Sequence, residues 1–320
     1  MHYAFMFWAS CLVPYARVNL GLMEYLEELQ SLDQLRDPVL LTGFMMRRRA
    51  GRLGARTIDY LAEQWHAEPV ARIDMTSFLN LAIHRPYVRR TETEAVLDWP
   101  DATIYVARQP PLKRDVFLLS TWEPDFKWKT FVNTLVSYLD GIGVRTLVSL
   151  RGRPGEVPHT RPAPTYLTAT DIDLELQFGV QSTRTRNEGP SSIAGALATQ
   201  VQALRWRTAE LAVVQPDYFP RMPNAEAMLA LVRLVDKAFG TTTDVSTLEE
   251  TAGDQREMLD RGIAGDQHSS SVIQEREANY DQGLEKLDFL APSQEPSELP
   301  SGEEILREVE KFFRRSESDD

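Results

Sequence analysis

The fold is decided by one stretch, residues 144–162, which reads VRTLVSLRGRPGEVPHTRP. Its first seven residues are mostly apolar and β-branched, and a short run of this kind predicts a strand that is covered on both faces of a sheet. Glycine and proline are frequent in residues 151–155, so we expect the strand to end there and a loop to follow. A polar loop at the carboxyl end of a buried strand is where open α/β sheets usually bind ligands. The stretch therefore predicts an α/β fold with a site around His159.

Outside this stretch, apolar runs of strand length alternate with segments of helical periodicity. We expect strands at 38–43, 70–74, 115–121 and 209–214, and helices at 24–36, 50–65, 126–139, 190–204 and 224–239. Alternation at this spacing predicts a three-layer α/β/α sandwich with a mixed, mostly parallel sheet. Residues 87–108 alternate between polar and apolar residues around a turn at 98–101, which predicts a projecting β-hairpin. We expect this hairpin to be the subunit contact.

The chain divides into a core at 23–240 and two C-terminal parts. No strand pattern recurs after Gly240, and helices predicted at 245–262 and 269–287 are expected to form a lid over the cleft in residues 241–290. Residues 291–320 comprise a linker rich in proline, serine and glutamate and a terminal amphipathic helix that a capping box begins. The apolar stripe of this helix must dock on its own body or on a protein partner. It consists of Ile305, Leu306, Val309, Phe312 and Phe313.

An apolar extension, residues 1–22, precedes the core. It fits a start codon placed too early, a poor secretory signal or an interfacial anchor, and we favour the first because a well-formed amphipathic segment begins at Met23. The apolar run ends at Pro14 and Arg17, far short of a bilayer span, so we expect no stable membrane insertion.

Charge and cysteine content exclude several classes of protein. The net charge is −12, and residues 241–320 hold 21 acidic and 8 basic residues, which leaves the rest of the chain nearly neutral. A nucleic-acid binder would need a positive footprint, so we expect no nucleic-acid partner. Cys11 is the only cysteine, which rules out an intrachain disulfide and fits a cytoplasmic protein.

Functional side chains collect in the predicted loops at strand ends. Ser191 and Ser192 follow Gly189-Pro190 at the start of a predicted helix, where free backbone N–H groups and the helix dipole attract an anion. Guanidinium groups bind phosphate or carboxylate in bidentate fashion, so Arg47, Arg48 and Arg49 are candidate ligand-binding residues with Glu123, Thr160, Arg161 and Asp217. The alternative is that the serines only cap the helix and the arginines pair with surface acids.

His159 is the candidate catalytic residue, as a general acid or base, because the ordinary pKa of histidine lies near neutrality. The alternative is that His159 is a hydrogen-bonded structural residue. For Glu123, the alternative to ligand binding is an ion pair with Arg161. The sequence contains no G-x-S-x-G motif, no Walker loop and no dinucleotide fingerprint, and His66, His84 and His268 are isolated in sequence. We therefore predict no metal and no cofactor.

Four segments together resemble the proteasome assembly chaperone family, in its prokaryotic and especially actinobacterial branch. They are Gly43-Phe44 with Ala50-Gly51, Glu123-Pro124 with Trp128, Pro158-His159-Thr160-Arg161-Pro162, and Gly189-Pro190. The resemblance spans roughly residues 28–285. It implies a core similar to that of purine nucleoside phosphorylases, a C-terminal helical portion over the cleft, and a homo-oligomer, which we expect to be a trimer. The branch has no firmly assigned activity.

The chain departs from the family pattern at three places. Met45, Met46 and the three arginines replace an acidic stretch that is rich in glycine and tryptophan, Ser191-Ser192 replaces Thr-Gly, and Asp217 replaces a histidine before Tyr218. Catalytic roles of those family residues do not transfer. We expect a binding or assembly protein with a cleft for an anionic or phosphate-like ligand. The alternative is an enzyme that acts on a nucleoside-like or phosphorylated small molecule with His159 as acid or base.

Overall fold

The computed structural model describes residues 23–46, 52–91, 94–108, 111–180, 182 and 189–283. The apolar extension at 1–22, the arginines at 47–49 and the linker and terminal helix predicted at 291–320 lie outside these residues. The elements in chain order are η2 (Met23–Tyr25), β1 (Leu26–Glu28), β2 (Val39–Met45), α2 (Leu53–Gln64), β3 (Glu68–Asp74), β4 (Tyr87–Arg90), β5 (Ala95–Asp98), β6 (Asp101–Ala107), β7 (Val116–Trp122), α3 (Trp128–Gly141), β8 (Thr146–Gly155), β9 (Thr165–Ala169), α4 (Ile172–Phe178), α5 (Ile193–Ala203), β10 (Arg207–Pro216), α6 (Ala225–Phe239), α7 (Ser246–Ile263) and α8 (Gln267–Asp281).

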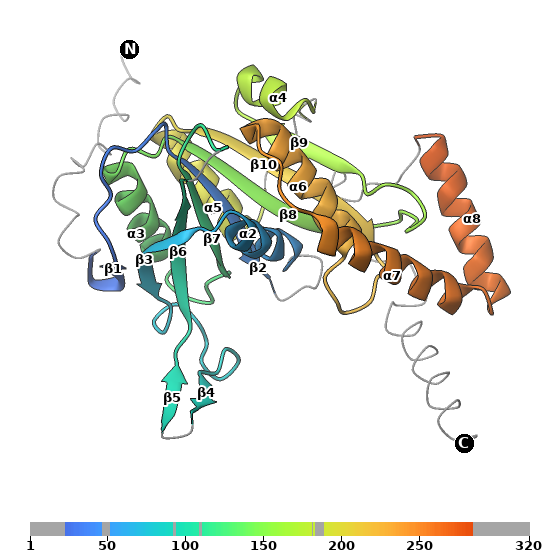
Figure 1. Cartoon of the computed structure of the whole chain (residues 1–320), viewed down its shortest axis with the longest axis horizontal. Helices are drawn as coiled ribbons and strands as arrows, with labels where there is room; N and C mark the ends of the chain where they lie inside the picture. The colour runs from blue at the N-terminus through green and yellow to red at the C-terminus, as the bar shows by residue number, and fades with distance from the viewer. Residues whose placement is uncertain are drawn as a thin grey trace, which may run out of the picture.

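An eight-stranded mixed sheet in the order β1-β3-β6-β7-β2-β8-β10-β9 forms the centre of the molecule (Figure 1). The four strands β7, β2, β8 and β10 pair in parallel, whereas β1, β3 and β6 at one end and β9 at the other join by antiparallel pairs. The expected predominance of parallel pairs therefore holds only for the four central strands. Their residues are almost all buried, as parallel strands covered on both faces require.

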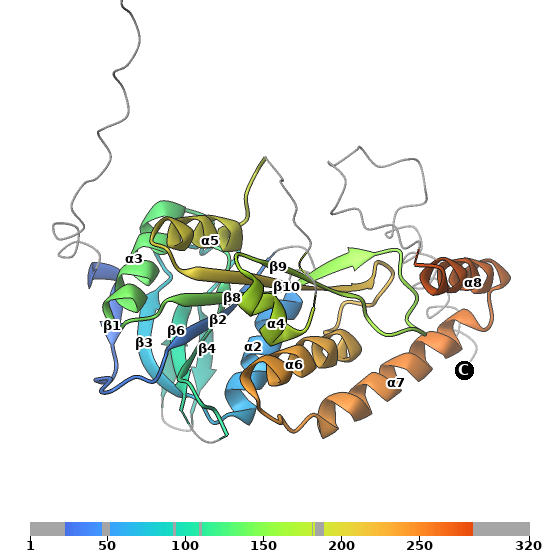
Figure 2. The same cartoon turned by 90° about the horizontal axis from the view of Figure 1, so that it is seen from above.

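Helices cover both faces of the sheet and complete the three-layer sandwich. Helices α3 and α5 pack on one face, and α2, α4 and α6 pack on the other, with a separate hydrophobic cluster on each side (Figure 2). Two glycines allow α2 to touch the sheet: a Cβ on Gly43 would lie 2.4 Å from the backbone nitrogen of Ala55, and one on Gly54 would lie 1.9 Å from the carbonyl oxygen of Leu150. The start of α2 is therefore fixed at the carboxyl edge of β2 and β8.

Two expectations for the sheet are wrong, namely the end of β8 and the helix at residues 24–36. Strand β8 does not end at Leu150 but continues to Gly155, because β10 pairs with it in parallel over its whole length and holds the glycine- and proline-rich part extended. The helix expected at 24–36 is instead a 3-10 turn followed by β1, whose backbone pairs with β3 at the sheet edge while Leu26 is buried.

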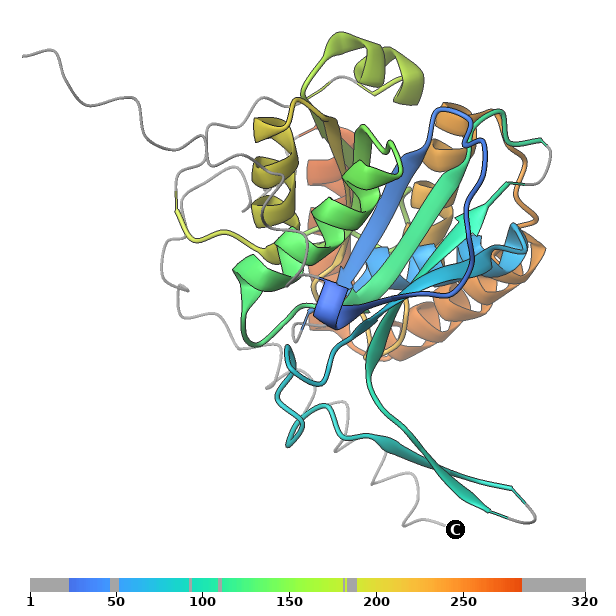
Figure 3. The ribbon, with the colours of Figure 1, turned by 90° about the vertical axis from the view of Figure 1, so that its left-hand side faces the viewer.

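A β-hairpin projects from the body (Figure 3), but its strands differ from those expected over residues 87–108. The hairpin consists of β4 and β5, which are joined by residues 91–94 rather than by the predicted turn at 98–101. The strand expected at 103–108 is β6, which pairs with β3 and β7 in the main sheet. Buried Ala102, Ile104 and Val106 explain why β6 belongs to the core and not to an exposed hairpin.

The C-terminal helices form at the expected places. Leu248 and Ala252 pack the first part of α7 against α6, and Ile273 is the buried residue of α8. Figure 2 shows α7 extending past the carboxyl edge of the sheet to α8, which lies beside the loop that follows β8. Among the described helices, none combines the length and apolar character needed to cross a bilayer.

Candidate functional site

The histidine loop, residues 156–164, follows β8 at the carboxyl edge of the parallel strands, as the sequence predicts. The neighbouring parallel strand β10 ends at Pro216 and is followed by Asp217 and Tyr218. The two strand ends therefore bring the histidine loop and Asp217 together. Backbone pairing continues past the strands, since the N–H of Asp217 donates to the carbonyl of Gly155 at 3.0 Å.

His159 uses both ring nitrogens in contacts with its own chain. Its Nδ1 lies 2.7 Å from the hydroxyl oxygen of Tyr218, and its Nε2 lies 3.1 Å from a carboxylate oxygen of Asp260 on α7. The same hydroxyl accepts the backbone N–H of His159 at 2.9 Å. Burial raises the pKa of the Tyr218 hydroxyl, so it keeps its hydrogen, which it donates to Nδ1. We therefore assign the ring hydrogen to Nε2, which donates it to Asp260.

Thr160 and Arg161 connect the histidine loop to α8. The Thr160 hydroxyl donates to the Glu277 carboxylate. Arg161 donates to both carboxylate oxygens of Asp281 at 2.9 Å and to Glu277 at 3.3 Å. This hydrogen bonding raises the pKa of Arg161 and lowers that of Asp281. The Tyr280 hydroxyl donates to the carbonyl of Pro162 at 2.9 Å, so three side chains of α8 hold it to the loop.

Asp217 makes a second attachment between the sheet edge and α8. Both of its carboxylate oxygens accept from Arg276, at 2.6 and 3.2 Å. The Arg276 guanidinium also lies over the Tyr218 ring, 5.2 Å from the ring centre, in a cation–π contact. Two candidate ligand-binding residues are thus each paired with a residue of opposite charge on α8: Arg161 with Asp281, and Asp217 with Arg276.

Glu123, Ser191 and Ser192 form a separate group at the start of α5. Glu123 accepts the backbone N–H of Ile193 at 2.9 Å, and the Ser192 hydroxyl accepts that of Gly195 at 3.3 Å. Ser191 donates to the carbonyl of Ser192. The helix end that the sequence predicts as an anion site thus has the carboxylate of Glu123 on its first N–H group. The ion pair considered between Glu123 and Arg161 does not form, because each has the other partners described above.

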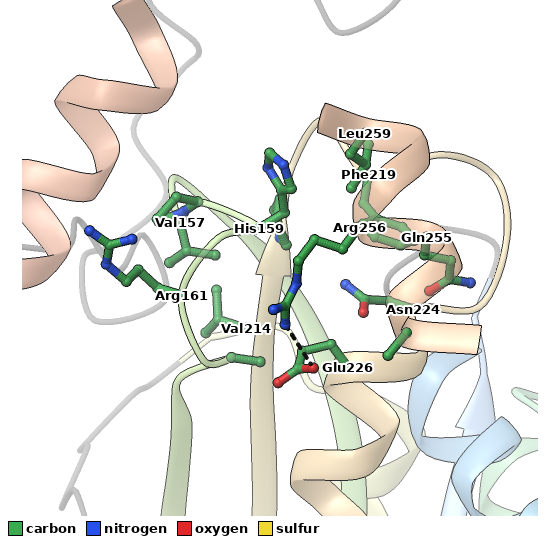
Figure 4. A pocket seen from close by; sticks show the side chains of 14 residues that line it. Val157, His159, Arg161, Val214, Phe219, Asn224, Glu226, Gln255, Arg256 and Leu259 are labelled. Atoms are coloured by element: carbon green, nitrogen blue, oxygen red, sulfur yellow. Dashed lines mark hydrogen bonds and ion pairs between the residues drawn. The ribbon is translucent and has the colours of Figure 1, made fainter. Parts of the chain in front are cut away.

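A small pocket of about 20 Å³ lies between the histidine loop and α7 (Figure 4). His159 and Arg161 line it on one side, and Arg256 on α7 extends toward Glu226 on α6, 3.5 Å away. This volume accommodates a water molecule but not a nucleoside, for which pockets of hundreds of cubic ångströms are usual. Glu123, Ser191 and Ser192 are not among the residues that line it. No group of three side chains suited to hold a metal ion gathers within the described ranges.

Sequence reasoning missed every partner of His159, Thr160 and Arg161. Only Tyr218 could have been found, because it follows the strand end next to Asp217, whereas the acids on α7 and α8 resemble the many other acids there. His84, which has no second histidine at ligand spacing in the sequence, also has partners that the sequence did not indicate. Its Nε2 lies 3.5 Å from Asp125, and its ring packs edge-on against Trp122, with ring centres 4.6 Å apart.

This chain resembles known proteins both in sequence and in structure. The model of the PAC2 family matches residues 48–262. A PAC2 family protein from Streptomyces avermitilis is 26% identical, with a TM-score of 0.67 over 74% of this chain and 100% of that one. A proteasome-assembly chaperone homologue from Mycobacterium tuberculosis is 29% identical, with a TM-score of 0.64 over 73% of this chain and 99% of that one. No curated protein matches the sequence.

Proposed function

Since this chain belongs to the PAC2 family, we propose that it is a non-enzymatic binding protein that assists the assembly of other polypeptides. The family match covers most of the core, and the relative from Mycobacterium tuberculosis is described as a proteasome-assembly chaperone homologue. The partner class that follows from this likeness is the proteasome subunit. The same proposal includes a cytoplasmic location, which the single cysteine supports.

One observation carries the choice of binding over catalysis: the reactive groups at the carboxyl edge are saturated by partners in the same chain. The His159 side chain is 5% exposed and both of its ring nitrogens are engaged. Arg161 and Asp217 are paired with α8, and Glu123 is bound to α5. A general acid or base must reach the proton that it transfers, and His159 does not have that access. These residues instead join α7 and α8 to the core.

Binding to purified proteasome subunits tests the proposal. The chain is expected to elute together with α-type or β-type subunits from the same organism and to change how fast they assemble into rings. The terminal segment 301–320 is the proposed contact, because its sequence places Phe312 and Phe313 on an apolar stripe. Phe312→Asp is expected to weaken co-elution, whereas Ser318→Asp, a matched control off the stripe, leaves it unchanged. Unaltered assembly with every subunit would refute the proposal.

We also propose that the protein acts as a homo-oligomer. The family resemblance implies a trimer, and the projecting hairpin supplies apolar surface that the body of the same chain does not cover. Light scattering coupled to size-exclusion chromatography gives the mass directly. Three times the monomer mass is the expected result, and a monomer at all concentrations would contradict it.

A small anionic ligand is the second function that we propose. The pocket beside His159 supports it, because Arg161 and Arg256 line the same space. Both guanidinium groups are paired with acids of the same chain, Arg161 with α8 and Arg256 with Glu226, so a bound anion would compete with these acids. The pocket has to widen by movement of α7, whose residues line it, to admit a phosphate group, so ligand binding and the position of α7 are linked in this proposal. Phosphate is expected to raise the melting temperature of the protein but not of an Arg256→Ala variant, which lacks one of the pocket's two guanidinium groups. Equal melting temperatures with and without phosphate would count against this function.

The enzymatic alternative differs from both proposals in one measurement. An enzyme with His159 as acid or base would lose turnover in His159→Gln and keep its melting temperature. If His159 has a structural role, His159→Gln is expected to lower the melting temperature, because glutamine cannot contact Tyr218 and Asp260 in the same way. In that case the parent protein has no turnover, so none can be lost. A broad metabolite screen with the parent protein provides the substrates for this comparison.

A further inference from the structure

The projecting hairpin carries an apolar face. Val88 on β4 lies opposite Leu97 on β5, so the two side chains share one face, and they are 49% and 48% exposed. Trp99, directly after β5, is 54% exposed and enlarges the same apolar end of the hairpin. A two-stranded hairpin is barely stable by itself, and neighbouring exposed apolar side chains usually mark a contact with another molecule. The hairpin therefore has the properties of an interaction surface.

Charge on the hairpin is divided between its two faces. Arg89 pairs with Asp98 at 2.8 Å on the face that also carries Tyr87. Arg90 lies opposite Ala95 on the other face, together with Val88 and Leu97, and forms no ion pair with any residue that the structure describes. The apolar face thus ends in a positive charge that no carboxylate of the described residues pairs with.

Helix α4 carries a matching surface with the opposite charge. Leu174 and Phe178 are buried against the core, whereas Ile172 and Leu176, four residues apart, are 67% and 73% exposed on the outer stripe. Asp173 and Glu175 flank that stripe, one on each side. Asp173 lies close enough to Arg207 to raise the pKa of that guanidinium, whereas Glu175 forms no ion pair within the described ranges. Among the described helices and strands outside the hairpin, only α4 carries two large apolar side chains that are this exposed.

The two surfaces cannot meet within one molecule. Figures 1 and 3 show the hairpin and α4 at opposite ends of the body. A contact between two hairpins would bring Arg90 near its own copy, and a contact between two α4 helices would bring the acids together, so like charges oppose both. A contact between hairpin and α4 places the arginine beside Asp173 and Glu175 and buries the apolar side chains of both.

We infer that the Val88/Leu97 face of the hairpin docks on the Ile172/Leu176 stripe of α4 in a second copy of this chain. Each copy then uses a different surface to bind the copies before and after it. Such a head-to-tail contact closes into a ring when its rotation allows and otherwise extends into a filament. The inference rests on the proposed self-association and does not depend on the proposed chaperone role.

Single substitutions on each surface test this contact in the full-length protein. Leu97→Asp and Leu176→Asp place a carboxylate in the apolar contact at positions so exposed that the fold tolerates them, which circular dichroism and the melting temperature check. Light scattering is expected to show loss of the oligomer in each variant at concentrations where the parent is fully assembled. Met222→Asp, at an apolar residue that is 40% exposed elsewhere, is the control and is expected to keep the parent mass.

Mixing the two variants distinguishes a hairpin–α4 contact from a hairpin–hairpin contact. In the mixture, the intact hairpin of the Leu176→Asp protein meets the intact α4 of the Leu97→Asp protein, so dimers are expected to return without larger rings. In a Cys11→Ser background, Leu97→Cys and Leu176→Cys are expected to cross-link to each other when mixed and not when each is alone.

Three results would overturn the inference, and they identify which proposal fails. A parent protein that is monomeric at every concentration removes the proposed self-association, and this contact with it. An oligomer that persists in both aspartate variants leaves self-association in place and removes this contact. Loss of the oligomer in Leu97→Asp alone indicates a hairpin–hairpin contact instead.

Discussion

The hydroxyl of Tyr218 lies 2.7 Å from Nδ1 of His159 and also accepts the backbone N–H of the same histidine at 2.9 Å. One half-buried hydroxyl oxygen thus fixes both the backbone and the ring orientation of His159. Because the hydroxyl follows β10 and the histidine follows β8, this pair of bonds joins the ends of two parallel strands.

Tyr218→Phe is expected to lower the free energy of unfolding by about 1–3 kcal/mol, the usual cost of leaving buried polar groups unpaired. The ring remains, so packing and the cation–π contact with Arg276 change little. Urea unfolding measures the difference. Tyr87→Phe is the control, because Tyr87 is 72% exposed. Equal losses in both variants would contradict the role of the Tyr218 hydroxyl.

The sequence predicted the strands of the sheet better than the contact between Tyr218 and His159. Runs such as Val39–Leu41 are apolar on both faces, which only a central parallel strand requires, so the sandwich followed from local pattern. Arg151–Gly155 has breaker residues, yet tertiary pairing with β10 extends the strand through them. Glycine and proline have a low propensity for strands, but pairing with a neighbouring strand along the whole length outweighs it here.

The candidate site shows the same limit. The position of His159 at a strand end follows from sequence, but Asp260 is 101 residues away and Glu277 is 117 residues from Thr160. Residues 241–320 hold 21 acidic side chains, and no local feature marks the three that contact the histidine loop. The direction of α7 and α8 across the sheet edge decides which acids do so, and that direction is a property of packing.

Low pH is expected to weaken the attachment of α8. The hydrogen bond from Arg161 lowers the pKa of Asp281 below its ordinary value of 3.8. A carboxylate with a lowered pKa in the folded protein stabilises it fully above its unfolded pKa, and this contribution is lost as the pH falls through the lower, folded pKa. The unfolding free energies of the parent and of Asp281→Asn should therefore differ by a constant amount between pH 7 and pH 5, and the difference should shrink below about pH 4.

The matched control for the attachment of α8 by Asp281 is Glu249→Gln, which removes an acid that pairs with Arg233 on an exposed surface away from the histidine loop. Its substitution should leave hydrogen exchange of α8 unchanged at pH 7, whereas Asp281→Asn should accelerate it. Identical α8 exchange in the two variants would show that Asp281 does not hold this helix.

Gly54→Ala is expected to lower the free energy of unfolding by at least about 3 kcal/mol, because the added Cβ would lie 1.9 Å from the Leu150 carbonyl oxygen and α2 would have to move off the sheet. Gly253→Ala, the control within helix α7, has nothing within 4 Å of the added carbon. It should raise the free energy of unfolding by about 0.5–1 kcal/mol, since alanine is the better helix former. Chemical denaturation of both variants provides the comparison, and similar effects would contradict the close approach of α2 to β8.

Glu123→Ala removes the carboxylate that accepts the Ile193 N–H at the start of α5. The expected cost is about 1–2 kcal/mol of unfolding free energy, from a lost charged hydrogen bond and a lost favourable contact with the helix dipole. Added formate is expected to restore part of this stability, because a free carboxylate can occupy the vacated position. The parent should gain less, since its own carboxylate is already there.

Glu257→Ala, at an exposed acid in the middle of α7, separates this rescue from a general salt effect. Formate should raise the melting temperature of Glu257→Ala and of the parent by the same small amount, and that of Glu123→Ala by more. If formate raises all three melting temperatures equally, then the start of α5 does not bind anions, and the position of Glu123 is a matter of packing alone.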